Sequence, residues 1–427
     1  PSLPRLRFHL CENSFRASMS FVHITCIVRM SRSLFHVTLK QLLAMNLQLY
    51  ASLRSRVMFL RIAACMLVSS ASIPTHWAFA ATSVPGELPS KPIAFHGATI
   101  HTVSGPTIEN GVLVIDQGTI VAVGTEEVIP DGATSIHVEG KHIYPGLFQS
   151  YTDLGLVEIN MVRASVDRME SGSVNPNVKA QVAVNPDSEL IPVTRSNGVL
   201  LALTAPSGPL IEGSSAIMQL DGWTWEDMTL RSPAAVHVRW PWLNAAGSSA
   251  SAAISESRSK NVEKQLLNLY EAFAEARVYA KSRSKKRPNE LLPVKLRWEA
   301  LLPVLEREIP LVVAADEAQQ IQEAVAFAAR QNVRLVILGG YDAPYCADLL
   351  KQYKVPVIIS AIYRVPRRRD DPYDAPYTLA QRLRKAGVQY CIAGGGRFAA
   401  SNARNLPYHA ATAVAYGLPH EEAIRAI

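Results

Sequence analysis

Three aspartates, Asp153, Asp316 and Asp342, each follow a short apolar run of the sequence. Apolar runs of this length predict buried strands, and barrel enzymes place their chemistry just past the carboxyl ends of such strands. Two carboxylates in a water-poor site can act as general acid and general base when their pKa values differ. We therefore treat these aspartates as the candidate catalytic residues. For Asp316 and Asp342 the alternative is a capping role, because acids are common at helix N-termini.

Candidate ligand-binding residues also lie at or just past the ends of predicted strands: Tyr151, His237, Tyr341, Arg367, Gly395 and Arg397. Arg367 belongs to "RVPRRRDDPYDAPY", an arginine-rich stretch that can clamp an anion or form an ordinary solvated loop. Gly395 and Arg397 belong to "GGGR", where the backbone can approach an anionic ligand beside a helix N-terminus or make a tight turn. The sequence leaves both pairs of alternatives open.

The elements that would position these residues change character near Gly146. From residue 91 to residue 145, short alternating runs with glycine turns predict a small all-β unit. Beyond it, apolar runs such as "IPLVVAA" and "VRLVILGG" alternate with helical stretches such as "AQQIQEAVAFAARQN". Repeating βα units of this length predict an α/β fold and favour a (β/α) barrel over an open sheet. Residues 255–290 depart from this rhythm and predict a charged, solvated helix.

The positive charge of the chain is concentrated at its front. Residues 1–81 contain nine of the 43 Lys/Arg and one of the 36 Asp/Glu, which leaves 34 basic and 35 acidic residues in the remainder. The folded body is therefore not basic, and nucleic acid is not an expected partner. Residues 58–80 combine Arg61, an apolar stretch and the ending Ala78-Phe79-Ala80. This pattern predicts a secretory signal peptide and a periplasmic or secreted mature chain without a membrane span. Residues 1–57 form a doubtful upstream segment to which no fold is assigned.

The stretch "FHGATIHTVSGPTIENGVLVIDQGTIVAVG", followed by "GKHIYPGLFQSYTDLG", resembles the amidohydrolase superfamily, in particular its imidazolonepropionase-like and prolidase-like branch. The resemblance continues through "LVILGGYDAPYCADLL" and "NLPYHAATAVAYGLPHEEAIRAI". It implies a (β/α)8 TIM-like barrel over residues 146–427, C-terminally truncated, with a small composite β-sandwich domain whose N-terminal part is 91–145. It also implies hydrolysis of carbon–nitrogen bonds in amides, cyclic amides or dipeptides, with zinc or another divalent metal as cofactor.

The metal-binding positions of that family fall on unsuitable residues in this chain. Its His-x-His pair falls on Tyr151 and Asp153. Its fifth-strand and sixth-strand histidines fall on Ala314 and Gly339, and its eighth-strand aspartate falls at or beside Gly395. A catalytic zinc needs about three ligands drawn from His, Asp, Glu and Cys. We therefore expect a degenerate metal site and predict no metal ligand and no bound cofactor.

The sequence leaves two functions open. The resemblance implies a hydrolase of non-peptide or dipeptide carbon–nitrogen bonds that works with an altered metal site or with carboxylates alone. The residues themselves favour a catalytically silent exported barrel that binds a small anionic or peptide-like ligand, or an active partner subunit. Both functions imply a small-molecule ligand, and both are compatible with an oligomer.

Overall fold

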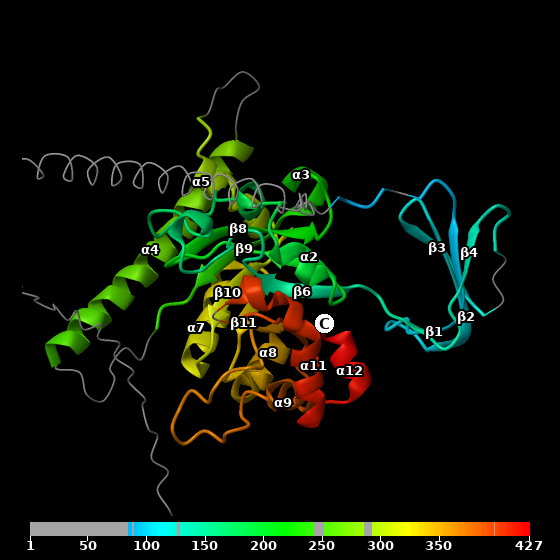
Figure 1. The fold of residues 1–427 in the computed structure, drawn as a ribbon. Coiled ribbons are helices and arrows are strands. Elements are labelled where there is room, and N and C mark those ends of the chain that lie inside the picture. The colour runs from blue at the N-terminus through cyan, green and yellow to red at the C-terminus, as the bar shows by residue number, and fades with distance from the viewer. Residues whose placement is uncertain (1–83, 88, 126–128, 243–251, 286–292, 397) are drawn as a thin grey trace, which may run out of the picture. The chain divides into compact units, whose positions relative to one another are not determined.

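The computed structural model describes residues 84–87, 89–125, 129–242, 252–285, 293–396 and 398–427. These residues belong to one compact unit, Ala81–Ile427. The upstream segment 1–57, the signal peptide 58–80 and the candidate ligand residue Arg397 lie outside the described residues. Figure 1 shows an eight-stranded sheet with helices around it and a separate small sheet. The predicted α/β class is therefore confirmed.

The small sheet contains five strands: β1 (Ile93–Ile100), β2 (Ile108–Asp116), β3 (Thr119–Gly124), β4 (Thr134–His137) and β5 (His142–Ile143). Strands β1, β2 and β3 are antiparallel neighbours, whereas β4 and β5 pair in parallel with β1. The β2–β3 hairpin turns at Gln117 and Gly118, both with positive φ, as tight hairpin turns require. The predicted all-β unit is thus present. Among the described residues it is one sheet, without the second layer of a sandwich.

The main sheet has eight strands in the order β13-β12-β11-β10-β9-β8-β7-β6. They are β6 (Leu147–Thr152), β7 (Val199–Thr204), β8 (Ile211–Gln219), β9 (Thr229–Arg239), β10 (Leu311–Ala315), β11 (Leu335–Gly339), β12 (Val357–Ile359) and β13 (Tyr390–Ile392). The two outer strands approach each other, because Ser150 Oγ on β6 donates to Ile392 O on β13 at 3.3 Å. Gly394 N, just past β13, also donates to Gln149 Oε1 on β6 at 2.8 Å. The sheet is therefore nearly closed into a barrel.

One strand breaks the regular (β/α)8 pattern that the resemblance implies. Strand β8 runs antiparallel to both β7 and β9, while the remaining neighbours are parallel. Only the six residues 205–210 connect β7 to β8, and a crossover between parallel strands needs a dozen or more. The connection is therefore a hairpin. The (β/α)8 prediction has the right number of strands but is wrong for this region.

The helices are α2 (Leu190–Arg195), α3 (Trp225–Met228), α4 (Ala252–Ser284), α5 (Leu296–Glu299), α6 (Leu302–Leu305), α7 (Ala318–Gln331), α8 (Ala347–Gln352), α9 (Leu379–Lys385), α10 (Ala399–Asn402), α11 (Leu406–Ala415) and α12 (His420–Arg425). Helix α7 buries Ile321, Ala324, Val325 and Ala328, at the spacing that lines one helical face. This face covers the sheet beside β10 and β11, which keeps the ends of those strands in place.

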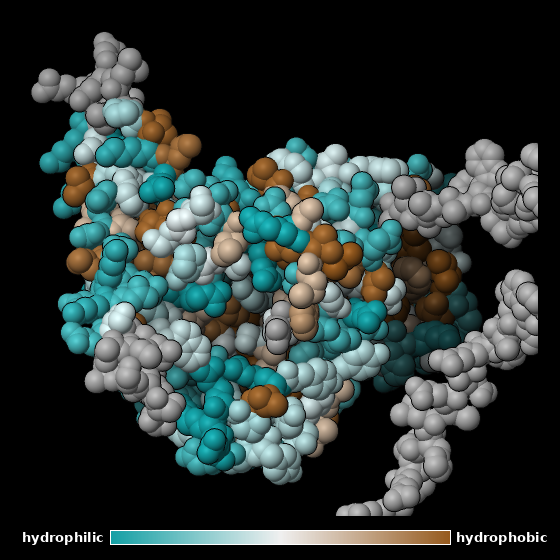
Figure 2. Space-filling model, turned by 60° about the vertical axis from the view of Figure 1, so that its left-hand side comes forward, coloured by the Kyte–Doolittle hydropathy of each residue, from teal (hydrophilic) through white to brown (hydrophobic). Residues whose placement is uncertain are grey.

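Helix α4 corresponds to the charged segment expected at 255–290. Its residues Leu269, Phe273 and Ala276 are buried in the main core, and the opposite side is exposed. On the face drawn in Figure 2, hydrophilic and hydrophobic residues are interspersed. No helix in the described ranges is both long and apolar enough to cross a lipid bilayer.

Candidate functional site at the carboxyl ends of the barrel strands

A cavity of about 320 Å³ opens at the carboxyl ends of the parallel strands. The convergence of these strand ends is what brings residues far apart in the sequence to one place. Of the predicted residues, Tyr151, Asp153 and Asp316 line it. The other lining residues are Arg168, Ala205, Ser207, Arg239, Trp240, Trp242, Ala314, Ala315, Gln320, Leu338, Gly339, Ser360, Gly396 and Ala399.

Asp153 is held by an arginine from the loop that follows β6. Arg168 Nη1 donates to Asp153 Oδ2 at 2.7 Å, and Asp153 is 8% exposed. Its other oxygen, Oδ1, is buried, and the described residues offer it no hydrogen-bond donor. A buried carboxylate oxygen without a donor is costly, and this one belongs to a residue that lines the cavity.

The side chain of Tyr151 is largely buried and is influenced by nearby charges. Burial raises the pKa of its hydroxyl, and the negative charges of Glu212 and Asp153 raise it further. The tyrosine is therefore a neutral hydrogen-bonding group at any physiological pH. It cannot act as a base in this position.

A second acid and arginine pair comes from strands β8 and β9. Arg239 Nη2 lies 2.8 Å from Glu212 Oε1, and Gly208 N donates to the same carboxylate oxygen at 3.1 Å. Burial raises the pKa of Glu212, and the charge of Arg239 opposes that rise. This pair was not predicted, because the segment "IEGSSAIMQ" is too polar for its periodicity to indicate a buried strand.

Asp316 is enclosed by the arginine-rich loop after β12. Arg367 Nη1 donates to Asp316 Oδ2 at 2.7 Å, and Arg364 Nη2 donates to the same oxygen at 3.1 Å. The Arg367 guanidinium also lies over the ring of Trp242, 4.7 Å from its centroid. Arg367 therefore contacts two lining residues, although it does not line the cavity itself. The loop therefore lies beside the opening of the cavity at the carboxyl ends of the strands, which we call the mouth.

Asp342 and Tyr341 form hydrogen bonds with residues of the same loop and do not line the cavity. Arg368 donates to both oxygens of Asp342, at 3.0 and 2.5 Å, and Asp342 Oδ2 accepts from Ala318 N at the start of α7. Tyr341 donates its hydroxyl hydrogen to Asp371 at 2.9 Å. Asp342 makes no cap hydrogen bond to the helical turn that follows it; it holds Arg368 and the first turn of α7 instead.

His237 is buried inside the barrel, next to Tyr151. It is 1% exposed, its ring centroid lies 5.9 Å from that of Tyr151, and neither ring nitrogen has a partner among the residues described. Burial lowers the pKa of the imidazole to about 3. The ring is therefore neutral at physiological pH. His237 does not line the cavity, and of the glycine run it is Gly396 rather than Gly395 that does.

The divalent metal implied by the family resemblance does not fit this site. Ala314 and Gly339 line the cavity and have no side-chain atom that could bind a metal. Asp153 is already paired with a guanidinium, which would repel a second cation. Within the described part of the chain, no three His, Cys, Asp or Glu side chains are grouped so that they could hold a metal ion.

No family model and no curated protein sequence matches this chain. Among solved structures, it is similar to an amidohydrolase from Thermotoga maritima MSB8, with 21% identity, 78% of this chain and 85% of that chain covered, and a TM-score of 0.68. A prolidase complexed with n-methylphosphonate-l-proline has 14% identity, 79% and 85% coverage and a TM-score of 0.43. A Xaa-Pro dipeptidase with bound methionine has 11% identity, 79% and 86% coverage and a TM-score of 0.41. At this identity, the Thermotoga similarity establishes a shared fold and leaves the activity open.

Proposed function

We propose that this chain is an amidohydrolase-type barrel that binds a small peptide-like molecule, an amide or a dipeptide, in the cavity at the mouth. The observation that carries the proposal is Asp153 Oδ1, a buried acceptor without a donor beside a cavity of about 320 Å³. Because Asp153 lines the cavity, a rotation of its carboxylate would present this oxygen to an N–H group of a peptide-like ligand, which would supply the missing hydrogen bond. The amidohydrolase fold supports the same class of ligand by analogy.

The charges around the mouth favour such a ligand over a strongly anionic one. Each acid is already matched with guanidinium groups: Asp153 with Arg168, Glu212 with Arg239, and Asp316 with Arg364 and Arg367. The wall therefore offers hydrogen-bond donors and acceptors without a large surplus of either charge. A peptide-like molecule, which carries both N–H and carbonyl groups, matches this wall better than a polyanion does.

A second candidate function is hydrolysis of the bound carbon–nitrogen bond without a metal. The same Asp153 oxygen could accept a proton from water, whose oxygen would then attack the carbonyl carbon. Arg168 and Arg239 line the cavity and could stabilise the oxyanion that forms there. The proton would return to the departing amine as the carbon–nitrogen bond breaks, which gives a carboxylate and an amine.

Calorimetric titration of the purified protein with a panel of dipeptides and N-acyl amino acids tests both candidates. We expect at least one of these compounds to bind and Asp153→Asn to weaken its binding about tenfold, the value of one charge-assisted hydrogen bond. The matched control is Asp348→Asn, because Asp348 is fully exposed on α8. If mass spectrometry detects the free amine released from a bound compound, the protein also hydrolyses that compound. Failure of the whole panel to bind, or an equal loss in the control variant, would reject the proposal.

A further inference from the structure

A larger cavity, of about 630 Å³, lies at the opposite ends of the barrel strands. It is formed by the segments that lead into four successive parallel strands, β10, β11, β12 and β13. Its walls are therefore the amino-end loops of the barrel, whereas the candidate functional site uses the carboxyl ends. The lining residues are Arg307, Pro310, Val325, Ala328, Ala329, Asn332, Val333, Arg334, Leu335, Val336, Gln352, Tyr353, Lys354, Val355, Pro356 and Gln389.

Three consecutive loops each contribute one cation to this cavity. Arg307 precedes β10, Arg334 precedes β11 and Lys354 precedes β12. All three are exposed, and the lining contains no aspartate or glutamate. In the described ranges, no carboxylate forms an ion pair with any of them. Arg307 donates instead to the amide oxygen of Asn332 at 2.8 Å, and Arg334 donates to the backbone carbonyl of Glu308 at 3.3 Å. The exposed side chains of Glu306 and Glu308 flank Arg307 in the sequence but do not line the cavity.

This arrangement differs from that of the mouth, where every lining arginine faces a carboxylate. Helix dipoles do not remove the surplus charge. Only α7, with 14 residues, ends beside the cavity as a long helix, and its carboxyl end provides about half a negative charge. Residues 82–427 as a whole contain 34 basic and 35 acidic residues. The three cations are therefore a local concentration of positive charge, and not a sample of a generally basic surface.

The rest of the lining is suited to an apolar group. Val325, Ala328 and Val355 provide buried aliphatic walls. Tyr353 lines the cavity and is 48% exposed, so its ring is available to an aromatic partner. A ligand that combines an anion with a ring or an aliphatic part would contact both kinds of wall.

We propose that this cavity binds a soluble small molecule that carries a phosphate or diphosphate group next to an aromatic or apolar part. Arginine and lysine donors on three loops can surround a phosphate from several sides. A lipid headgroup offers the same chemistry. The concave shape favours a small molecule that enters the cavity over the flat surface of a bilayer.

Calorimetric titration with ADP and with inorganic pyrophosphate tests the proposal. We expect ADP to bind to one site, more tightly than pyrophosphate, and less tightly at ~0.5 M salt because the exposed cations are screened. Arg334→Gln and Lys354→Gln should each weaken binding about fivefold to tenfold, and the double variant more than either. The substituted residues are exposed, so folding should be retained.

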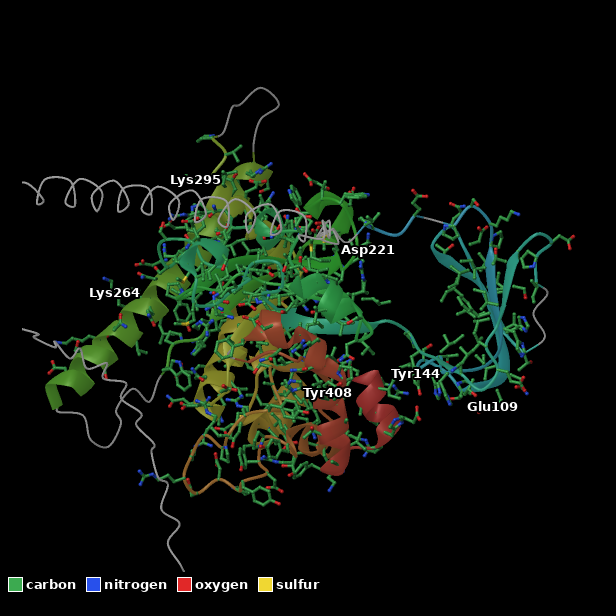
Figure 3. All side chains as sticks on the ribbon, in the orientation of Figure 1. Glu109, Tyr144, Asp221, Lys264, Lys295 and Tyr408 are labelled. Atoms are coloured by element: carbon green, nitrogen blue, oxygen red, sulfur yellow. The ribbon has the colours of Figure 1, made fainter. Side chains whose placement is uncertain are left out.

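Matched controls are Arg231→Gln on β9 and Lys264→Gln on α4, two exposed residues away from the cavity (Lys264 is labelled in Figure 3). These should bind ADP within about twofold of the parent protein. Three results would overturn the proposal: no saturable binding of either phosphate compound, an equal loss in the control variants, or binding only to vesicles that contain an anionic phospholipid. Dipeptide binding at the mouth is measured in a separate titration, so a negative result there would not reject the proposal for this cavity, and the reverse also holds.

Discussion

Among individual residues, Asp153 and His237 differ in how their polar groups are satisfied. Asp153 is paired with Arg168. His237 is neutral and enclosed, since burial lowers its pKa to about 3. Asp153 Oδ1 and both ring nitrogens of His237 have no hydrogen-bond partner among the described residues. Their hydrogen-bonding capacity stays available for water or for a bound molecule.

The buried imidazole makes the stability of the protein depend on pH. Because the folded pKa lies below the ordinary value of about 6.5, the unfolded chain binds a proton that the folded chain does not. This contribution is fully present above pH 6.5 and is lost as the pH falls toward 3. At pH 5 the loss should be about 2 kcal/mol.

Urea unfolding of the parent protein and of His237→Leu at pH 7 and pH 5 measures this effect. The variant removes the titrating group and keeps an apolar side chain of similar size. When the pH drops from 7 to 5, we expect the free energy of unfolding of the variant to fall by about 2 kcal/mol less than that of the parent protein. An identical fall in both proteins would show that His237 does not titrate in this way.

Gly339 lies where the backbone conformation and a neighbouring side chain leave little room for a side chain. Its φ is +103°, and an added Cβ would lie 2.7 Å from Asp316 Oδ1. Asp316 is held by two arginines, so it cannot easily move away. We expect Gly339→Ala to lower the free energy of unfolding by about 1–3 kcal/mol.

Gly387→Ala is the matched control for that substitution. Gly387 also has a positive φ, +71°, but an added Cβ would meet only Lys351 Cδ, at 3.7 Å. Chemical denaturation should therefore show a loss near 1 kcal/mol for the control and a larger loss for Gly339→Ala. Equal losses would mean that the contact with Asp316 does not change the free energy of unfolding.

At the scale of elements, the loop after β12 is fixed over the mouth by three arginines. Arg364 and Arg367 bind Asp316, Arg368 binds Asp342, and Arg367 also stacks on Trp242. The loop is tied in this way to the ends of β10 and β11. Half-buried, charge-assisted contacts of this kind stabilise a closed arrangement more than exposed ion pairs do.

Removing one of these ties should loosen the loop. Arg367→Gln is expected to raise hydrogen exchange in residues 363–374 about tenfold, because it loses an ion pair and a cation–π contact. Mass spectrometry of exchanged peptides gives the measurement. Arg369→Gln is the matched control, since Arg369 is exposed and two positions away. The interpretation is wrong if both variants exchange at the parent rate.

The elements differ in how well the sequence predicts them. Strands β10 and β11 are continuous apolar runs, so their positions and the acids that follow them were predictable. Strand β8 contains Glu212, Gly213, Ser214 and Ser215, a composition that no periodicity rule assigns to a buried strand. Arg168 and Arg239 could not be placed for another reason. Their partners are fixed by tertiary folding and not by spacing along the chain.

In the molecule as a whole, the architecture of the barrel and the charges at its two ends carry different information. The nearly closed barrel and the similarity to the Thermotoga amidohydrolase place the chain in a known architecture. The charges at its two ends then distinguish two sites. The mouth is lined by matched acids and arginines, whereas the amino-end cavity carries cations without acids. We infer that the two ends bind different classes of molecule.

We propose that the mouth recognises a peptide-like molecule through Asp153 and without a metal. This proposal is tested most directly by calorimetric titration of a dipeptide into the protein, with and without an excess of EDTA, for the parent and for Asp153→Asn. We predict the same affinity with and without EDTA, and an affinity about tenfold weaker in the variant. Binding that disappears on chelation and returns with zinc would contradict the account.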